Sequence, residues 1–473
     1  MIPAVTLDFA AVVRDVIDPA VEECERNPPR LGPDGEVEFD PAYERAGRAV
    51  WASGIVGADA VEQASLFYLL AQAGEGGHAC PVVCTAGLVR TLRTRASDEL
   101  RDRFLPPLLE TDYDRAERGA QFLTERHGGS DVGANRVEAV PDGDGWRLQG
   151  EKWFCSVADA DQFLVTARPR GAPEGTRGIG CFLVPRAGGG FRIRRLKDKL
   201  GTRALATGEI EFGGAVAYPI GPLEEGFRTA VSVLNTSRWL NGVGSTGLMR
   251  RAYDVASEFA GEREAFGRPI SEFPLVRENL AVMKAETEAA YASTAALTEL
   301  VARIDQGEAS DDDISWHRLL VNANKVVTSL AATRVVRRGI ETLGGNGTIE
   351  DFSPLPRLWR DAIVFESWEG THNVLCAQVL RDLGRMGAVE LAVDRAGASE
   401  ELAARLRRSI ENAAFGALHF RRQLDELVRS LQVRVLRESE PLSAELIQHR
   451  HLTPGWDPEL DPDYASLLDA ILV

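Results

Sequence analysis

The sequence lacks any apolar run of about 20 residues, the length that a membrane-spanning helix needs. It also begins without a basic leader ahead of an apolar segment, so we expect no secretory signal and a cytoplasmic protein. Basic residues are outnumbered: 54 lysines and arginines stand against 71 aspartates and glutamates, and the net charge is −17 at pH 7. A chain with this charge repels nucleic acid and anionic membranes, so we expect neither as a partner.

Cysteine is scarce and scattered. The 473 residues include six cysteines, and no two of them form a CxxC pair. Cys80 and Cys84 are separated by three residues, and only His78 lies near them in the sequence. This pattern excludes a disulfide framework and predicts buried, reduced thiols with no metal site.

The middle of the chain holds the segment in which strand periodicity is clearest. Asn135–Val140 alternates polar and apolar residues, and Trp146–Phe154 does much the same. Between them, residues 141–145 read Pro-Asp-Gly-Asp-Gly, and residues of this kind tolerate positive φ in tight turns. The pattern predicts a β-hairpin inside an otherwise helical chain, and a flat bound cofactor would explain such an insertion.

Helical periodicity before and after this segment predicts a mainly helical α+β protein. We expect a helical domain over residues 1–115, a β-domain over 116–224, a helical bundle over 225–385 and a helical extension over 386–473. The predicted helices cover residues 5–21, 43–55, 64–72, 88–109, 227–259, 275–304 and 314–343, and the extension is predicted to be helical to about residue 437 and irregular beyond it. The predicted strands include residues 162–167, 180–184 and 209–212, with hairpin tips at 170–178 and 188–190.

Four short motifs carry residues that could bind a ligand. A glycine-rich loop follows Thr124-Glu125, and Trp153 to Ser156 places an aromatic ring beside a hydroxyl. Arg263 to Arg268 precedes a long predicted helix, and Glu369 lies among apolar residues just before another. Taken alone, each motif is more typical of a plain turn, a strand core or a charged helix end.

The order of the motifs, however, resembles the acyl-CoA dehydrogenase superfamily. From about residue 5 to residue 385 the chain carries T-E-x-x-G-G-S-D, G-E-K-W-F, L-G-T-R, R-x-x-F-G, L-G-G-N-G, P-x-x-R-x-x-R-D and W-E-G-T in that order. Lys152–Ser156 and Leu196–Arg203 are most similar to the AidB-like branch. The resemblance implies the acyl-CoA dehydrogenase fold, which has an N-terminal helical domain, a central β-barrel or sandwich-like domain and a C-terminal four-helix bundle.

The resemblance also implies noncovalent FAD and a set of site residues. Glu369 matches the catalytic base, and Arg238 matches an arginine near it. The positions that match cofactor contacts are Phe122, Leu123, Thr124, Gly129, Ser130, Phe154, Ser156, Arg263, Phe266, Glu341, Gly344, Gly345, Thr371 and Asn373. Because Arg263 and Phe266 match residues that reach a neighbouring subunit's FAD, a homodimer or homotetramer is implied. Gln121, His127, Ala265 and Glu341 depart from the family pattern.

Three functions fit these residues. The first is dehydrogenation of an acyl thioester, on CoA or a carrier protein, with electron-transfer flavoprotein or oxygen as acceptor. The second keeps the flavin but performs an oxidase or natural-product reaction that starts from the same α-proton removal. The third is a non-enzymatic, AidB-like flavoprotein that associates with nucleic acid. Residues 386–473 argue against it, because they contain ten arginines and fifteen acidic residues, a net charge of −5.

Overall fold

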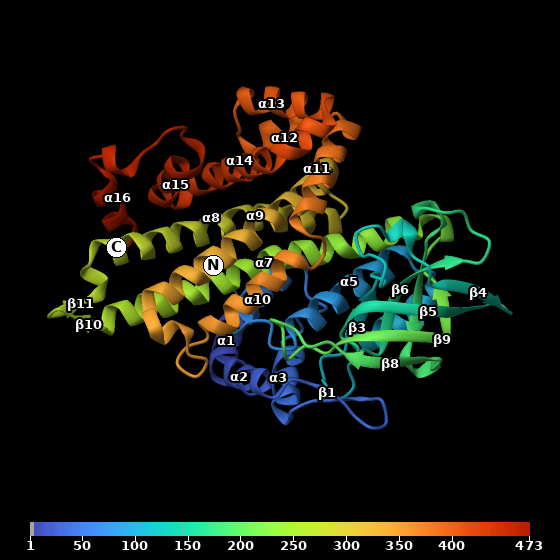
Figure 1. Ribbon diagram of the computed structural model, residues 1–473. Coiled ribbons are helices and arrows are strands. Elements are labelled where there is room, and N and C mark those ends of the chain that lie inside the picture. The colour runs from blue at the N-terminus through green and yellow to red at the C-terminus, as the bar shows by residue number, and fades with distance from the viewer. Residues whose placement is uncertain (1–3, 144) are drawn as a thin grey trace. The chain divides into compact units, whose positions relative to one another are not determined.

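The computed structural model describes residues 4–143 and 145–473, and the chain divides into two compact units. The first unit ends at Ser237 and the second begins at Arg238. Figure 1 shows helices in both units and strands concentrated in the first. The division into four domains stays a prediction.

The first unit begins with helices. Their bounds are α1 (Ala4–Val12), α2 (Asp18–Arg26), α3 (Pro41–Ala52), α4 (Ala60–Leu70), α5 (Ala79–Arg95) and α6 (Asp98–Leu108), with a π-helical turn at Val13–Ile17 and a short pair of strands, β1 (Arg30–Leu31) and β2 (Val37–Glu38). The single helix predicted over residues 88–109 is wrong. Two helices replace it because Ser97 caps α6, its side chain accepting a hydrogen bond from the Leu100 amide.

The β-domain is a sheet that closes on itself. Its strands are β3 (Gly119–Phe122), β4 (Glu138–Asp142), β5 (Gly145–Ser156), β6 (Gln162–Pro169), β7 (Gly180–Pro185), β8 (Phe191–Leu196) and β9 (Thr207–Pro219). Pairings β6–β4, β4–β5, β5–β9, β9–β7 and β7–β6 complete a ring, while β3 pairs with β6 and β8 with β9. The ring is the central β-barrel implied by the family resemblance.

The predicted hairpins are partly correct. β4 and β5 pair antiparallel with Asp142 opposite Gly145, although residue 144 of the predicted turn lies outside the described residues. The loop at 170–178 joins β6 to β7, which also pair antiparallel. The tip predicted at 188–190 is wrong, because the β8 that follows pairs with β9 and not with β7. Prediction missed β8 itself, although its Phe-Arg-Ile alternation was a signal for a strand.

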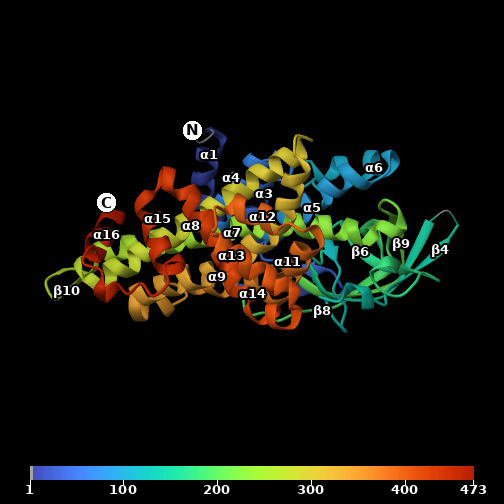
Figure 2. The same ribbon diagram turned by 90° about the horizontal axis from the view of Figure 1, so that it is seen from above.

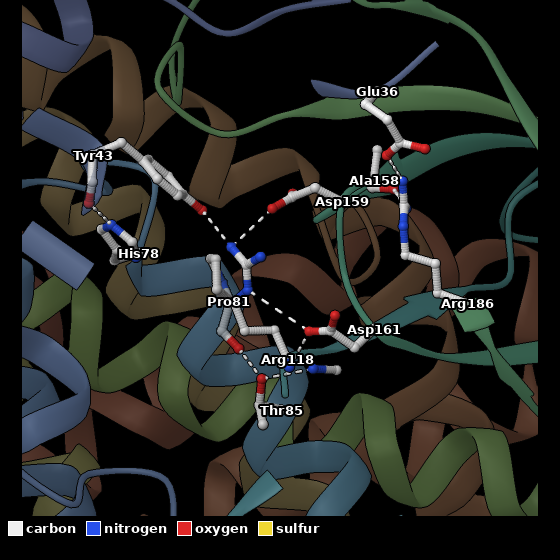
Figure 3. Close-up of polar contacts among 11 residues, drawn as sticks. Glu36, Tyr43, His78, Pro81, Thr85, Arg118, Ala158, Asp159, Asp161 and Arg186 are labelled. Carbon is white, nitrogen blue, oxygen red and sulfur yellow. Dashed lines mark hydrogen bonds and ion pairs between the residues drawn. The ribbon is translucent and has the colours of Figure 1, made fainter. Parts of the chain in front are cut away.

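A polar network joins the N-terminal helices to the barrel within the first unit (Figure 3). Arg118, just before β3, pairs with Asp159 at 2.8 Å between Nη1 and Oδ2, and its amide donates to Asp161 Oδ2 at 2.8 Å. The same guanidinium lies 3.5 Å from the Tyr43 hydroxyl of α3. His78 Nε2 lies 2.7 Å from the Tyr43 carbonyl oxygen. These bonds fix where β3 starts, and β3 leads into the glycine-rich loop.

The second unit is built on long helices. They are α7 (Gly226–Glu262), which begins before the unit boundary, α8 (Pro274–Asp305), α9 (Asp311–Leu343), α10 (Leu355–Ser367) and α11 (His372–Met386), with the hairpin strands β10 (Glu264–Ala265) and β11 (Arg268–Pro269). The predictions for 275–304 and 314–343 are correct to within three residues at each end. In the core of this unit, alanine side chains of α7 pack with leucine and valine side chains of α9 and α10.

The extension packs on α8. Its helices are α12 (Val389–Ala396), α13 (Glu400–Glu411), α14 (Ala413–Ser439), α15 (Pro441–Ile447) and α16 (Tyr464–Ile471). Figures 1 and 2 both show α15 beside α8, and apolar side chains of α8, α14, α15 and α16 share one core. The irregular segment predicted after residue 437 is partly wrong, because Pro441 occupies the first turn of α15, where proline is tolerated. In the described part of the chain, no helix is long and apolar enough to cross a membrane.

Candidate functional site

The turn between α10 and α11 carries Glu369, the predicted catalytic base. α10 ends at Ser367 and α11 begins at His372, and Glu369 between them has a φ of +55°. A glutamate in this left-handed region costs about 1–3 kcal/mol, and such strain persists where the surroundings hold it, often at functional sites. Its side chain is half-buried, next to Trp368, whose ring stacks on Phe365 at 4.6 Å between centroids.

The side chain of Arg238 bonds to the backbone of this turn. Its Nε donates to the carbonyl oxygen of Glu369 at 2.9 Å, and its Nη1 donates to Asn322 Oδ1 at 2.8 Å. Burial lowers the pKa of Arg238 to about 10, and the Glu369 carboxylate opposes that shift. The structure therefore brings together the two residues predicted as catalytic, with the guanidinium held by Asn322.

The residues predicted to contact flavin on the barrel lie at the end of β3 and on β5. Phe154 is 56% exposed on β5, and Ser156 Oγ on the same strand lies 3.3 Å from Thr207 Oγ1. Leu123 is buried, and its carbonyl oxygen accepts a hydrogen bond from Lys152 Nζ at 3.0 Å. Phe122 is fully buried against Phe163, so only its backbone could meet a ligand.

The glycine-rich loop folds back on the end of β3. The carbonyl oxygen of Thr124 accepts from the Trp153 amide at 2.9 Å, which ties the loop to β5. A Cβ at Gly129 would lie 2.7 Å from Thr124 Oγ1, so the close approach requires glycine there. Gly129 and Ser130 are exposed. An exposed aromatic ring, a hydroxyl and a glycine loop, all attached to β5, are a donor set that suits an isoalloxazine ring and a phosphate.

The remaining predicted contacts lie on other segments of the second unit. Arg263 precedes the β10–β11 hairpin, whose Phe266 is 98% exposed with a φ of +52°. Gly344 caps α9 with a φ of +63°, and open space surrounds the position of a Cβ at Gly345. Glu341 is exposed, with an oxygen 3.9 Å from the Arg337 guanidinium.

Thr371 and Asn373 directly follow the Glu369 turn. Thr371 is the N-cap residue of α11, and no side-chain hydrogen bond caps the helix. Asn373 Oδ1 accepts from Arg421 of α14 at 2.7 Å, so the extension reaches this helix start. The contact was not predicted, because nothing near Arg421 in the sequence marks it as a partner of α11.

Sequence reasoning missed three buried or partly buried cations near the predicted site residues. Lys152 Nζ lies 2.9 Å from Glu125 Oε1, Lys197 Nζ lies 3.6 Å from the centre of the Trp153 ring, and Lys325 contacts the Glu369 turn. A lone lysine in the apolar interior of α9 was a signal for Lys325. Among the described residues, no group of three or more His, Cys, Asp or Glu could hold a metal ion, and the six cysteines are buried and form no disulfide.

Family models match three successive parts of the chain. The AidB N-terminal domain model (adaptive response protein AidB) matches residues 19–115, the acyl-CoA dehydrogenase middle domain matches residues 120–215, and the acyl-CoA dehydrogenase C-terminal domain matches residues 224–384. AidB of Escherichia coli is 34% identical over 379 residues, which cover 75% of this chain and 68% of AidB. The chain belongs to the acyl-CoA dehydrogenase family. It is therefore a flavoprotein-family oxidoreductase with an AidB-type N-terminal domain.

The chain is also similar to a second curated protein and to a solved structure. Acyl-CoA dehydrogenase family member 11 of Caenorhabditis elegans is 37% identical over 324 residues, covering 64% of this chain, although the chain spans only 51% of that relative. The apo form of Bd2924 superposes with a TM-score of 0.86 at 29% identity, covering 94% of this chain and 95% of Bd2924.

Two solved family structures contain ligands. ACDH-11 of Caenorhabditis elegans, in complex with C11-CoA, superposes with a TM-score of 0.84 at 26% identity, and the match covers 97% of this chain and 88% of the ACDH-11 chain. An acyl-CoA dehydrogenase of Bacillus anthracis, complexed with FAD, shares the fold with a TM-score of 0.76 at 20% identity, covering 99% of this chain and 86% of its own. Homologues in the family thus bind acyl-CoA and FAD.

Proposed function

We propose that the protein is an FAD-dependent dehydrogenase of an acyl thioester, in which Glu369 removes the α-proton. The observation that carries the proposal is the Glu369 turn: a glutamate in left-handed backbone, half-buried, with Arg238 bonded to its carbonyl oxygen. A relative binds C11-CoA, and this supports a thioester as the substrate class.

FAD fits the residues of the barrel. Phe154 and Ser156 would lie beside the isoalloxazine ring, and the loop with Thr124, Gly129 and Ser130 would hold phosphate oxygens through backbone amides and hydroxyls. Bound FAD would supply the acceptor for the hydride that leaves the β-carbon. The exposed hairpin with Arg263 and Phe266 and the glycine pair after α9 support cofactor sharing between copies in a homodimer or homotetramer.

The proposed base works by position and environment. Removal of a proton α to a thioester carbonyl needs a general base within hydrogen-bond reach and a donor for the developing oxyanion. Glu369 provides the carboxylate, and a backbone amide next to it can bond the thioester oxygen. Arg238 stays protonated at neutral pH because even its lowered pKa is about 10, so it can orient the turn but cannot replace the base.

The test is Glu369→Gln, with Glu299→Gln on the exposed face of α8 as the matched control. Loss of a general base typically costs about 10²–10⁴-fold in rate, so anaerobic reduction of the flavin by a panel of acyl thioesters should slow by that factor in stopped flow. FAD content and thioester binding should match wild type. Near-normal flavin reduction by Glu369→Gln would eliminate Glu369 as the base.

Two further measurements separate the other functions. Steady-state oxygen consumption with the same thioesters distinguishes a dehydrogenase from an oxidase. A dehydrogenase consumes oxygen slowly when oxygen is the only electron acceptor, whereas an oxidase consumes it rapidly. The net charge of −5 over residues 386–473 supports a function without nucleic acid. Salt-dependent DNA binding at physiological ionic strength, lost on truncation after Met386, would contradict that expectation.

A further inference from the structure

Two buried cations hold the turn that carries Glu369. The carbonyl groups at the C-terminal end of a helix have no partner within the helix, and the carbonyls of a following turn need partners as well. Arg238 Nε on α7 donates a hydrogen bond to the carbonyl oxygen of Glu369 at 2.9 Å. Lys325 Nζ on α9 donates to two further carbonyl oxygens, that of Glu366 at 2.8 Å and that of Gly370 at 3.0 Å. Three carbonyl oxygens within five residues therefore point at two cations.

Lys325 is an unusual residue for this position. Its side chain is fully buried, at 0% exposure, and the partners of its ammonium at the turn are carbonyl dipoles. Lys152 in the barrel is equally buried but lies 2.9 Å from a carboxylate oxygen of Glu125. Burying an ammonium is costly even when carbonyl groups solvate it, so a methionine of similar size would be favoured if packing were the only requirement.

The Lys325 ammonium also interacts electrostatically with the proposed base. Burial lowers the pKa of Lys325 to about 7, the charge of Glu369 opposes this shift, and Arg238 reinforces it. The three groups thus form one coupled cluster inside the second unit. A cation at the end of α10 is favoured as well, because the C-terminal end of a helix carries partial negative charge.

We propose that Lys325 is a positioning residue: together with Arg238 it clamps residues 366–370 so that the strained backbone presents the Glu369 carboxylate in one orientation. The inference rests on the proposed function, since it assigns Lys325 a purpose in the reaction through Glu369. Neighbouring polar groups complete the arrangement. Ser329, one turn along α9, donates to the Lys325 carbonyl oxygen at 2.7 Å, and its Oγ lies 3.0 Å from His372 Nε2 at the start of α11.

The experiment compares Lys325→Met with Lys284→Met in the FAD-loaded protein. Lys284 is a matched control, because its Nζ also donates to a backbone carbonyl, that of Ile471 at 2.6 Å, but far along the sequence from the Glu369 turn. Three quantities are measured: amide hydrogen exchange of peptides covering residues 366–373, the limiting rate of flavin reduction, and the dissociation constant of the thioester. Lys325→Gln, which keeps an amide donor, replaces Lys325→Met if the latter does not fold.

Lys325→Met should raise amide exchange in residues 366–373 and slow the limiting flavin reduction by about 10–100-fold, the scale expected when a catalytic group is misplaced by about 1 Å. The dissociation constant of the thioester and the FAD content should stay within about twofold of wild type, as in Lys284→Met, since the change affects geometry and not binding. Unchanged exchange in the turn, or a limiting rate within about twofold of wild type, overturns the proposal. An equal loss of rate in Lys284→Met overturns it too, because the effect would then be general destabilisation.

The outcome is separable from that of the proposed function. If Glu369→Gln reduces flavin normally, the base is wrong, whereas exchange in the 366–373 peptides still decides whether Lys325 holds the turn. If Glu369→Gln is inactive and Lys325→Met keeps its full rate, Glu369 remains the base and the clamp is unnecessary for it.

Discussion

The buried ion pair between Lys152 and Glu125 provides a sharp test of what holds the predicted flavin loop. Lys152 is 0% exposed and Glu125 is 5% exposed. The Lys152 ammonium donates to Glu125 Oε1 at 2.9 Å, to the Leu123 carbonyl oxygen at 3.0 Å and to Thr166 Oγ1 at 3.2 Å. Glu125 in turn accepts from the backbone amides of Arg136 at 2.6 Å and of residue 137 at 3.1 Å. The pair thus connects β3, β5, β6 and the segment before β4.

The expected magnitude follows from what each single substitution leaves behind. Lys152→Met leaves a buried carboxylate with two amide donors but no counter-charge, and Glu125→Gln leaves a buried ammonium with neutral partners. Breaking a buried pair in this way typically costs about 3–5 kcal/mol. For a unit of this size, such a loss lowers the melting temperature by roughly 10 °C. The double variant should be less destabilised than the sum of the two single variants, because neither charge is then left alone.

The assay is denaturant or thermal unfolding of both single variants and the double variant, followed by a signal from the first unit. Arg170→Met is the matched control, because Arg170 forms an ion pair with Glu138 on the same sheet at 2.8 Å, with both side chains partly exposed. Screening by water should leave that variant close to wild type. Additive losses in the double variant, or single losses no larger than that of Arg170→Met, would refute the reasoning.

Three other predictions follow from the same structure. The purified protein should be yellow with one noncovalent FAD per chain, and colourless protein that gains no flavin absorbance when FAD is added would contradict this. Light scattering should give a homodimer or homotetramer because of the exposed hairpin with Phe266, and an FAD-saturated monomer would show that the hairpin is only a surface loop. Burial lowers the pKa of His78 from 6.5 to about 3, so the unfolded chain binds a proton that the folded chain cannot. Stability should therefore be lost as pH falls from about 6.5 to 3, by about 1.4 kcal/mol per unit, and His78→Gln should flatten this slope in acid unfolding curves; equal slopes would refute the assignment.

Some of the fold could be predicted because its signals are local. The long helices α8 and α9 have helical periodicity and distinct ends, and the Gly344-Gly345 pair terminates α9 where the sequence indicates. The β4–β5 hairpin has alternating strands around a turn-forming sequence. By contrast, closure of the barrel depends on the parallel pairing of β6 with β4, which no short-range pattern reveals.

The candidate site divides in the same way. Glu369 and Arg238 were both predicted from the family resemblance, and the structure joins them through the carbonyl oxygen of Glu369. Lys325 could not be assigned a purpose, since its partners lie more than forty residues further along the chain and become its neighbours only when α10 and α11 pack on α9. The left-handed backbone at Glu369 was equally hidden, because glutamate carries no preference for it.

The buried cysteines give the protein a built-in chemical reporter of local opening. Alkylating reagents react with the thiolate form of cysteine. Burial raises the pKa of Cys24 to about 12 and also raises the pKa of Cys376, so these two thiols form little thiolate in the folded chain. Cys376 belongs to the second unit, whereas the other five cysteines belong to the first. Alkylation followed by mass spectrometry of cysteine peptides would therefore show which unit opens first, in the unmodified sequence and with no engineered label.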